Sequence, residues 1–151
     1  MVLAPKTDQY FMQEALKEAQ KAFDLDEVPV GAIIVCEDQI IARAHNFTER
    51  LNDVTAHAEM QAFTAAADYL GGKYLNECTL YVTLEPCTMC AGASYWTQLK
   101  KVVVGASDEK RGFRKMAGNV LHPKTIYTEG ILAKDCAQLL TDFFARKREL
   151  K

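Results

Sequence analysis

Residues 79–93 read TLYVTLEPCTMCAGA, a strand pattern that runs directly into a helix pattern. Residues 79–84 are rich in β-branched and aromatic side chains, and Pro86 then opens a helix that continues to about Gln98. Cys87 and Cys90 are three positions apart in that helix, so both sulfur atoms face the same side. These residues alone leave four uses of the cysteine pair open: a redox switch, half of a structural zinc knuckle, part of a catalytic metal site, or packing.

Strand and helix patterns alternate along the rest of the chain. Further helices are predicted at residues 8–24 with Asp8 as N-cap, at about 55–70 with Thr55 as N-cap and Gly71-Gly72 as the stop, and at 131–148. Further strands are predicted as a hairpin over 30–46 that turns at 37–39, at 101–106 and at 125–128, with 107–123 irregular. Strands separated by helices imply parallel pairs with helices on both faces, after an antiparallel hairpin at one edge. The fold class is therefore predicted as α/β, a three-layer α/β/α sandwich with a mixed five-stranded sheet.

Composition limits the class of protein. The 151 residues predict one domain over 1–151, with an ordinary 49% hydrophobic and 25% charged residues. The net charge of −2 excludes a uniformly basic nucleic-acid binder but leaves room for a local basic patch. No apolar run approaches the ~20 residues of a membrane span, and residues 1–12 do not read as a signal peptide, so a cytoplasmic protein with no membrane partner is expected.

Five cysteines, an odd number, argue against a disulfide framework in a reducing compartment. Three of them, Cys36, Cys78 and Cys136, lie in strand or helix patterns and are expected to be buried small side chains.

A histidine and a glutamate complete a set of residues that suits a metal. His57 lies in the sequence HAE, residues 57–59, at a predicted helix start, as Cys87 does thirty positions later. Two helix starts that follow neighbouring strands can converge at one end of the sheet, where α/β folds bind ligands. One imidazole and two thiolates are three zinc ligands, which leaves the fourth position open for water, as in catalytic sites. Glu59 would then be free to carry protons.

Other interpretations of these residues weaken when they are taken together. Alone, the cysteine pair, His57 and Glu59 would each read as redox, structural or surface residues. A closed structural zinc site would need a fourth cysteine or histidine, and neither His45 nor His122 falls in a paired ligand spacing. The combination therefore predicts one catalytic Zn²⁺ per chain, bound by His57, Cys87 and Cys90.

H-x-E followed by P-C-x-x-C is the signature of zinc nucleobase deaminases. Several stretches, VPVGAIIV, AHAEM, CTLYVTLEPCTMCAGA, VVVGASDEKRG and TEGILAKDCAQLLTDFF, together resemble the bacterial tRNA adenosine deaminases over nearly the whole chain. The resemblance implies a homodimer of the cytidine deaminase-like fold. It also implies an enzyme that converts the wobble adenosine of a tRNA anticodon stem-loop to inosine.

The resemblance carries roles over residue by residue. It implies zinc ligands at His57, Cys87 and Cys90 and a catalytic proton shuttle at Glu59. It also implies five residues that contact the substrate. Asn46 would donate a hydrogen bond to the base, Pro29 and Val30 would form a wall of the pocket, and Ala58 would contribute a backbone contact. Asp108 would contact the RNA backbone. Without it, Asn46 would read as a turn former and Pro29-Val30 as a strand start.

One segment departs from the family pattern. Residues 109–125 are shorter than expected, and Phe113-Arg114-Lys115 replaces a Gly-Ser-rich stretch. Residues 94–96, SYW, resemble the IYW of guanine deaminases. The alternative function is therefore a deaminase of a free base or nucleoside, with guanine as the first candidate. A non-catalytic zinc-stabilised RNA-binding protein is a more distant alternative.

Trp96 is expected in the core or in a dimer interface, and Phe143-Phe144 is expected in the core or stacked against a base. Two basic clusters suit phosphate contacts, and from them the candidate RNA contacts are Lys110, Arg111, Arg146, Lys147 and Arg148.

Overall fold

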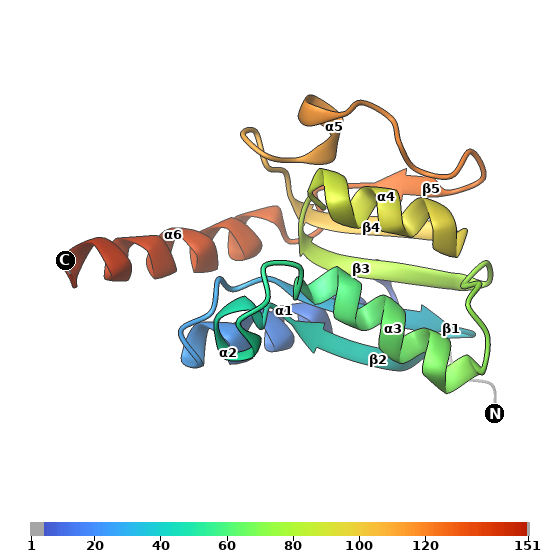
Figure 1. Ribbon diagram of the computed structural model, residues 1–151, viewed down its shortest axis with the longest axis horizontal. Helices are drawn as coiled ribbons and strands as arrows, with labels where there is room; N and C mark the ends of the chain where they lie inside the picture. Colours follow the sequence, from blue (N-terminus) through green and yellow to red (C-terminus); the bar gives the residue numbers. More distant parts are fainter. Residues whose placement is uncertain (1–4, 151) are drawn as a thin grey trace.

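A computed structural model describes residues 5–150 and places a five-stranded sheet at the centre of the molecule (Figure 1). The strand order across the sheet is β2-β1-β3-β4-β5. β1 pairs antiparallel with both of its neighbours, whereas β3, β4 and β5 run parallel to one another. The strands are β1 Gly31–Cys36, β2 Gln39–His45, β3 Cys78–Leu84, β4 Lys101–Ala106 and β5 Ile126–Thr128. The predicted mixed sheet is confirmed.

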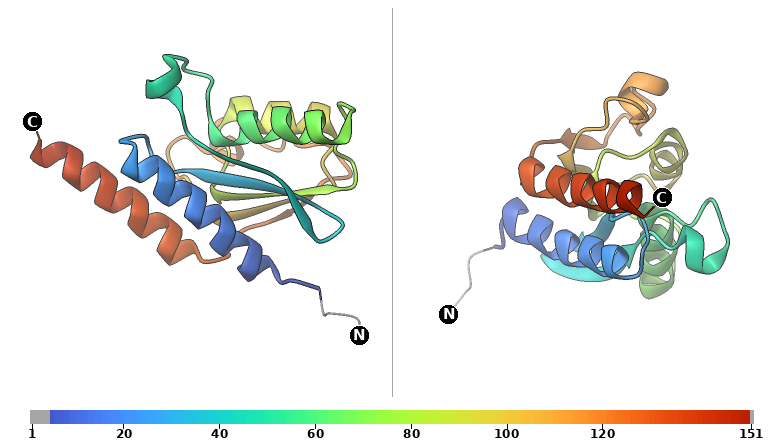
Figure 2. Two further views of the ribbon diagram at one scale, coloured as in Figure 1. Left: turned by 90° about the horizontal axis from the view of Figure 1, so that it is seen from below. Right: turned by 90° about the vertical axis from the view of Figure 1, so that its left-hand side faces the viewer.

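Helices cover both faces of this sheet. α1 and α6 pack on one face, and α3 and α4 pack side by side on the other (Figures 1 and 2). The helices are α1 Asp8–Asp24, α2 Thr48–Leu51, α3 Ala58–Leu70, α4 Thr88–Thr97, α5 Phe113–Met116 and α6 Ala133–Glu149. The predicted three-layer α/β/α arrangement is therefore confirmed.

Side chains of the central strands alternate between two core layers. Ile34 and Leu80 are fully buried on the side of α3, and Ile33 and Tyr81 are buried on the side of α1. Because helices cover both faces, the central strands read as continuous apolar runs rather than as an alternating pattern. At Gly31 the chain passes so close to α1 that a Cβ atom would lie 2.1 Å from the carbonyl oxygen of Ala15, so only glycine fits there.

The helix starts differ from the sequence prediction by one or two residues. α4 begins at Thr88 rather than at Pro86, α6 begins at Ala133 rather than at residue 131, and two N-caps also differ. The N-cap of α1 is Thr7, whose hydroxyl accepts a hydrogen bond from the amide of Tyr10, and not Asp8. The N-cap of α3 is His57, not Thr55, because Thr55 lies in a tight turn where its amide and hydroxyl both donate to Asp53. Two short helices were not predicted. α2 lies in the loop between β2 and α3, and α5 lies within residues 107–123, which were expected to be irregular.

The position of β1 between β2 and β3 is the main topological feature that the sequence pattern did not indicate. The rule that strands separated by helices pair in parallel holds for β3, β4 and β5. β2 and β3 are also separated by a helix, yet they are not neighbours, because β1 lies between them. The hairpin turn itself is confirmed: Glu37 and Asp38 have positive φ angles of 51° and 64°, as a two-residue turn requires.

Within residues 5–150, no helix is both long and apolar enough to cross a membrane. The single-domain prediction for residues 1–151 stays a prediction, and its two ends lie outside the described residues. The same holds for the first four residues of the segment in which no signal peptide was expected.

Candidate active site

Two helix starts meet at the carboxyl end of the parallel strands. His57 is the N-cap residue of α3 and Cys87 is the N-cap residue of α4, both with extended backbone. β3 ends at Leu84, and the chain passes through Glu85 and Pro86 into α4, which fixes the position of Cys87. Because α3 and α4 lie side by side on one face of the sheet, their N-termini carry these side chains to one place (Figures 1 and 2).

Three side chains here could hold a metal ion. The Nδ1 atom of His57 lies 3.6 Å from the sulfur of Cys87 and 3.6 Å from the sulfur of Cys90. All three ligand atoms lie within 4.8 Å of one another. Tetrahedral zinc, with Zn–N near 2.0 Å and Zn–S near 2.3 Å, separates a nitrogen from a sulfur ligand by about 3.5 Å. The donor set and its spacing therefore fit one zinc ion with a fourth position left open.

Hydrogen bonds among the three side chains shift the pKa values of all of them. Hydrogen bonds from Cys90 first, and also from His57, lower the pKa of Cys87 to about 4, so this sulfur is a thiolate at neutral pH. The same contact with Cys87 and burial raise the pKa of Cys90, which keeps its proton. The bond to Cys87 also raises the pKa of His57. Because a metal takes thiolates and neutral imidazole, zinc uptake must release protons from this group.

Glu59 lies in the first turn of α3, next to the ligands, and is only 4% exposed. Burial raises the pKa of its carboxyl to about 7, and the negative charge of Cys87 adds to the rise. A general acid–base works best when its pKa lies near the working pH, because it can then both accept and donate a proton. The position and pKa of Glu59 therefore suit the predicted proton shuttle, whose catalytic role stays a prediction.

The predicted substrate contacts lie beside this group. The side-chain oxygen of Asn46 accepts a hydrogen bond from the amide of Ala58 at 2.9 Å, and the Asn46 amide donates to the carbonyl of Val30 at 3.1 Å. Pro29 and Val30 are both buried. The structure thus brings four of the five predicted substrate contacts together, although the N–H of Ala58 is already engaged by Asn46. Their roles toward a base stay predictions.

Asp108, the fifth, lies in a loop that its own side chain organises. Its carboxylate accepts hydrogen bonds from the amides of Lys110 and Arg111 at 3.1 and 3.0 Å. Lys110 and Arg111 are exposed. The same loop is joined to the zinc-site helix by an isolated bridge between Cys87 and Gly112. Asp108 therefore lies in a loop attached beside the metal ligands, and its contact with RNA stays a prediction.

Sequence reasoning missed two buried carboxylates that hold the loops around the site. Glu85, 5% exposed, accepts hydrogen bonds from the amides of Asp108 and Arg114, both at 3.1 Å. Glu27, fully buried, accepts from the amides at the start of α2, at Glu49 and Arg50. The signal that could have found Glu85 is a charged residue at the end of an apolar strand directly before Pro86.

Gly112→Ala is expected to lower the melting temperature by about 2–12 °C. A Cβ atom at Gly112 would lie 2.3 Å from the carboxyl carbon of Glu85 and 2.6 Å from the carbonyl oxygen of Asp108. Overpacking of this kind costs about 1–3 kcal/mol, and a chain of this size loses about 2–4 °C per kcal/mol. Thermal unfolding measures the shift. The matched control is Gly92→Ala in α4, where nothing lies within 4 Å of the added atom; an equal loss there would contradict this account.

The predicted RNA-binding residues at the C-terminus are partly engaged within the protein. Arg146 lies 3.2 Å from a carboxylate oxygen of Asp26, and its guanidinium lies over the ring of Phe23 at 4.3 Å. Lys147 also pairs with Asp26. Arg148 is exposed. Arg146 and Lys147 therefore join α6 to the end of α1, so their charges are not fully available to a phosphate.

Two cavities lie elsewhere on the described residues, and the candidate zinc ligands line neither of them. The larger, about 670 Å³, lies between the end of α1, α2 and α6, and its lining residues are Leu25, Asp26, Val28, Glu49, Arg50, Phe143, Phe144 and Lys147. Of the two phenylalanines, Phe143 is in the core at 3% exposure, whereas Phe144 is 44% exposed.

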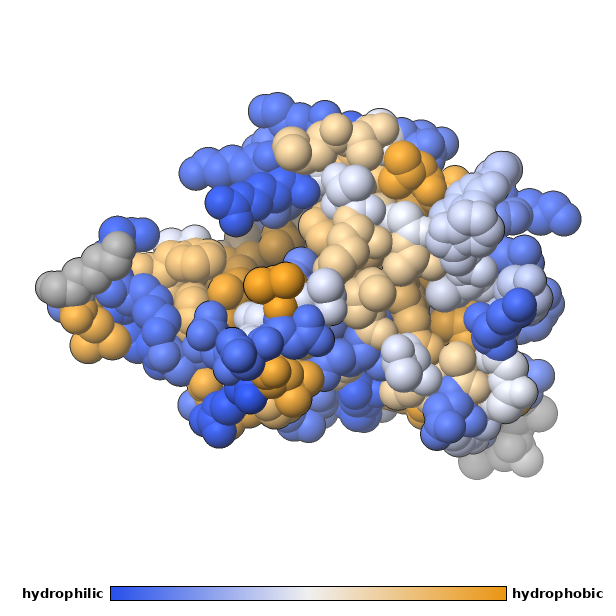
Figure 3. Space-filling view, in the orientation of Figure 1, coloured by the Kyte–Doolittle hydropathy of each residue, from blue (hydrophilic) through white to orange (hydrophobic). Residues whose placement is uncertain are grey.

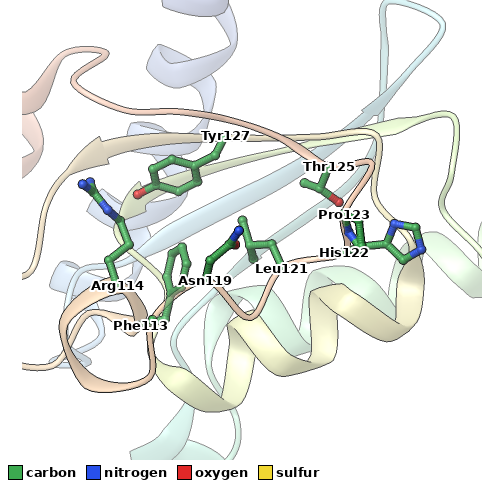
Figure 4. Close-up of a pocket in the computed structure, with 9 residues that line it drawn as sticks. Phe113, Arg114, Asn119, Leu121, His122, Pro123, Thr125 and Tyr127 are labelled. Carbon is green, nitrogen blue, oxygen red and sulfur yellow. The ribbon is translucent and has the colours of Figure 1, made fainter.

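The smaller cavity, about 360 Å³, lies in the segment that departs from the family pattern (Figure 4). Phe113, Leu121 and Tyr127 line it together with the polar side chains of Arg114 and Asn119. Arg114 and the hydroxyl of Tyr127 both donate hydrogen bonds to the carboxylate of Glu129, so the polar groups of these three side chains satisfy one another. None of the candidate zinc ligands lines this cavity, and neither does Glu59, so we assign it no part in the chemistry.

Comparisons with known proteins agree with this site. Residues 5–106 match the family described as "Cytidine and deoxycytidylate deaminase zinc-binding region". A tRNA-specific adenosine deaminase of Aquifex aeolicus (strain VF5) is 45% identical over 144 residues, which cover 93% of this chain and 95% of that protein.

Solved structures of deaminases also resemble this chain. A structure from studies of A-to-I editing by tRNA:A34 deaminases at the wobble position superposes with a TM-score of 0.81 at 39% identity, covering 87% of this chain and 99% of that one. A guanine deaminase from Bacillus subtilis superposes with a TM-score of 0.65 at 38% identity, but covers only 68% of this chain and 66% of that one.

The sandwich fold and the three-ligand group beside a buried carboxyl define a zinc-dependent deaminase with the cytidine deaminase-like fold. Within that class, the similarity to tRNA-specific adenosine deaminases covers almost the full length of the chain, and this shows the family. The chain belongs to the family of tRNA-specific adenosine deaminases.

Proposed function

We propose that this chain hydrolyses the exocyclic amino group of the wobble adenosine in a tRNA anticodon, which gives inosine and ammonia. The observation that carries the proposal is the convergence of His57, Cys87 and Cys90 beside the buried carboxyl of Glu59. The substrate follows from relatives named tRNA-specific adenosine deaminase, whose likeness covers 93% of the chain.

Glu59 carries the proton transfers in this proposal. It takes a proton from the attacking water and delivers it to the departing ammonia, which its pKa of about 7 allows in both directions near neutral pH. A zinc ion held by His57, Cys87 and Cys90 would act as a Lewis acid that makes water a better nucleophile at neutral pH.

Asn46 is assigned to orient the base. Its side-chain oxygen is engaged with the amide of Ala58, which fixes the plane of the carboxamide. The NH₂ group, which has no partner among residues 5–150, is left to donate a hydrogen bond to a ring nitrogen of the base. Pro29 and Val30, joined to Asn46 through the Val30 carbonyl, form the wall against which the base packs.

The anticodon loop suits this pocket. A deaminase must take its target base out of any stack, at a cost of a few kcal/mol that is smallest for a base that is already unpaired. Sequence-specific RNA recognition uses such loop bases, because their edges and faces are accessible. The surface is hollowed between the segment around α5 and the region of α2, next to the start of α4 (Figure 3), which leaves room for a loop.

Neutralising Lys110, Arg111 and Arg148 to glutamine is expected to weaken stem-loop binding and to flatten its salt dependence. All three side chains are exposed, and binding to phosphates accounts for the salt dependence of nucleic-acid affinity. The slope of log K against log salt should fall by about 0.7–0.9 for each phosphate that is no longer neutralised. Binding measured by fluorescence anisotropy between 50 and 200 mM salt, roughly the range over which such charges matter, gives the slope.

A matched control removes three charges from the opposite end of the sheet. Lys73, Lys100 and Lys124 precede β3, β4 and β5 and are exposed. Their glutamine variants should keep both affinity and slope. If both triple variants showed the same fall in slope, the RNA-binding role assigned to the first three residues would be wrong.

Arg146 and Lys147 are left out of this variant because they pair with Asp26. Removing them would also break the contact between α6 and the end of α1. Any contact they make with RNA would have to compete with that pair, so Arg148 carries the proposal at this end of the chain.

A homodimer in the cytoplasm is part of the same proposal. On α4, Trp96 is 76% exposed and Tyr95 is 40% exposed, and the two rings meet edge to face. The alternative expectation for Trp96, a core position, is therefore wrong. An exposed aromatic pair of this size suits a protein contact. Sedimentation of the purified chain should give the mass of two copies.

A deaminase of a free base, guanine first, is the second candidate. The likeness to a guanine deaminase favours it, although that match covers less of the chain than the tRNA deaminase match. A non-catalytic zinc-stabilised protein is disfavoured, because a purely structural site has no use for the buried carboxyl of Glu59 next to its ligands.

A further inference from the structure

Cys36 and Cys78 face each other across the sheet. They are direct partners in the antiparallel pairing of β1 with β3, at the last residue of β1 and the first residue of β3. Both side chains lie on the α3 side of the sheet, where Cys78 is fully buried and Cys36 is partly exposed. The fold thus places two free thiols together that the sequence analysis treated as separate packing residues.

The backbone shows which kind of antiparallel pair they form. The carbonyl of Cys78 accepts a hydrogen bond from the amide of Lys100, so the polar backbone groups of Cys78 point toward β4 and away from β1. Cys36 and Cys78 are therefore a non-hydrogen-bonded pair. In such pairs the Cα atoms are about 4.5 Å apart and the side chains approach each other most closely. Disulfides form between cysteines whose Cα atoms are about 4.4–6.8 Å apart, so this pair lies inside the range.

The two thiols differ in access. Burial, with help from the neighbouring Cys36, raises the pKa of Cys78 to about 12, so Cys78 stays a protonated thiol. Cys36 lies at the hairpin turn and is the sulfur that a reagent from solution can reach. This arrangement, an accessible sulfur backed by a buried one, is that of an attacking and a resolving cysteine.

We infer that Cys36 and Cys78 form an oxidisable dithiol, a modification site separate from the zinc ligands, that closes to an intrachain disulfide. With a small disulfide such as oxidised glutathione as co-reactant, the sulfur of Cys36 attacks it and releases one glutathione thiol. The thiol of Cys78 then gives up its proton, and its sulfur attacks the Cys36 sulfur of the mixed disulfide to form the Cys36–Cys78 bond. The second glutathione leaves as the thiolate that takes up this proton. The protein loses two hydrogen atoms, and one oxidised glutathione becomes two reduced ones.

The Cys36–Cys78 disulfide would change the stability of the fold and would not change the rate of deamination. It lies at the end of the sheet opposite the zinc site, because β3 begins at Cys78 and reaches the site only after Leu84. The loop that it closes runs from Cys36 to Cys78 and contains α2, α3, His57 and Glu59. Closing a loop of this kind restricts the unfolded chain, so the oxidised form should resist unfolding.

The test treats the zinc-loaded full-length chain with excess oxidised glutathione. The intact mass should fall by two hydrogen atoms, and a peptide map should join the Cys36 peptide to the Cys78 peptide. The melting temperature should rise by about 4–12 °C. Deamination of a stem-loop by the oxidised protein should stay within about twofold of the reduced protein, since the zinc site is untouched.

Three variants separate the proposal from its alternatives. Cys36→Ser should abolish both the link and the rise in melting temperature, whereas Cys78→Ala should trap one glutathione on Cys36. Cys136→Ser is the matched control, because Cys136 is equally buried but lies on the α1 side of the sheet, and it should behave as the parent does. A parent protein that does not react, that keeps glutathione on Cys36, or that links Cys87 to Cys90 instead would overturn the inference.

Discussion

Glu59→Ala is expected to lower the rate of deamination by about 10²–10⁴-fold while the protein stays folded and keeps its zinc. General acid–base catalysis by one positioned side chain is typically worth this factor. Glu59 is not one of the three ligands, so its removal leaves the metal group intact. Single-turnover formation of inosine measures the chemical step, and metal analysis of the same sample measures zinc.

Two further variants sharpen this test. Glu59→Gln keeps the volume of the side chain but cannot accept a proton, so it should lose as much activity as the alanine variant. Glu77→Ala, an exposed glutamate at the opposite end of the sheet, should keep full activity. Turnover by Glu59→Ala within threefold of the parent would exclude Glu59 as the proton shuttle.

The second large effect concerns the metal. The purified chain should contain about one zinc per molecule, and Cys87→Ala or Cys90→Ala should reduce this to a small fraction of one. Each variant removes one of three ligands whose donor atoms lie within 4.8 Å of one another. Because the fourth position of a catalytic site is open, only two of the assigned protein ligands would be left to hold the ion.

The matched control for this experiment is Cys136→Ala, which removes a buried thiol on the other face of the sheet and should leave the zinc content at one. Chelator-free purification followed by elemental analysis gives the zinc content of the parent and of the three variants. Full retention of zinc in both Cys87→Ala and Cys90→Ala would refute the ligand assignment.

Local patterns predicted most of the elements, because their causes are local. The apolar runs at 101–106 and 79–84 and the stop at Gly71 depend on the residues within each segment, and the structure confirms them. The zinc group was also predictable, since the spacing of Cys87 and Cys90 and two helix starts at one end of a sheet bring its members together.

Features that depend on contacts between distant segments could not be predicted. Nothing in the residues of β1 says that it separates β2 from β3, because β1 pairs with β3 across a long stretch of sequence. Asp26 pairs with Arg146 and Lys147 across more than a hundred positions of sequence, which changed the expectation for the basic C-terminus. The anchoring of the 108–114 loop by Glu85 is another such contact.

The substrate assigned to this chain is the wobble adenosine of a tRNA. The most direct measurement incubates the zinc-loaded chain separately with an anticodon stem-loop, free adenosine, cytidine and guanine, and follows both ammonia release and the identity of the base at the wobble position. We expect stoichiometric inosine at that position of the stem-loop and little turnover of the free compounds, with Glu59→Gln as the inactive control. Rapid release of ammonia from guanine, with adenosine left unchanged in the stem-loop, would contradict it.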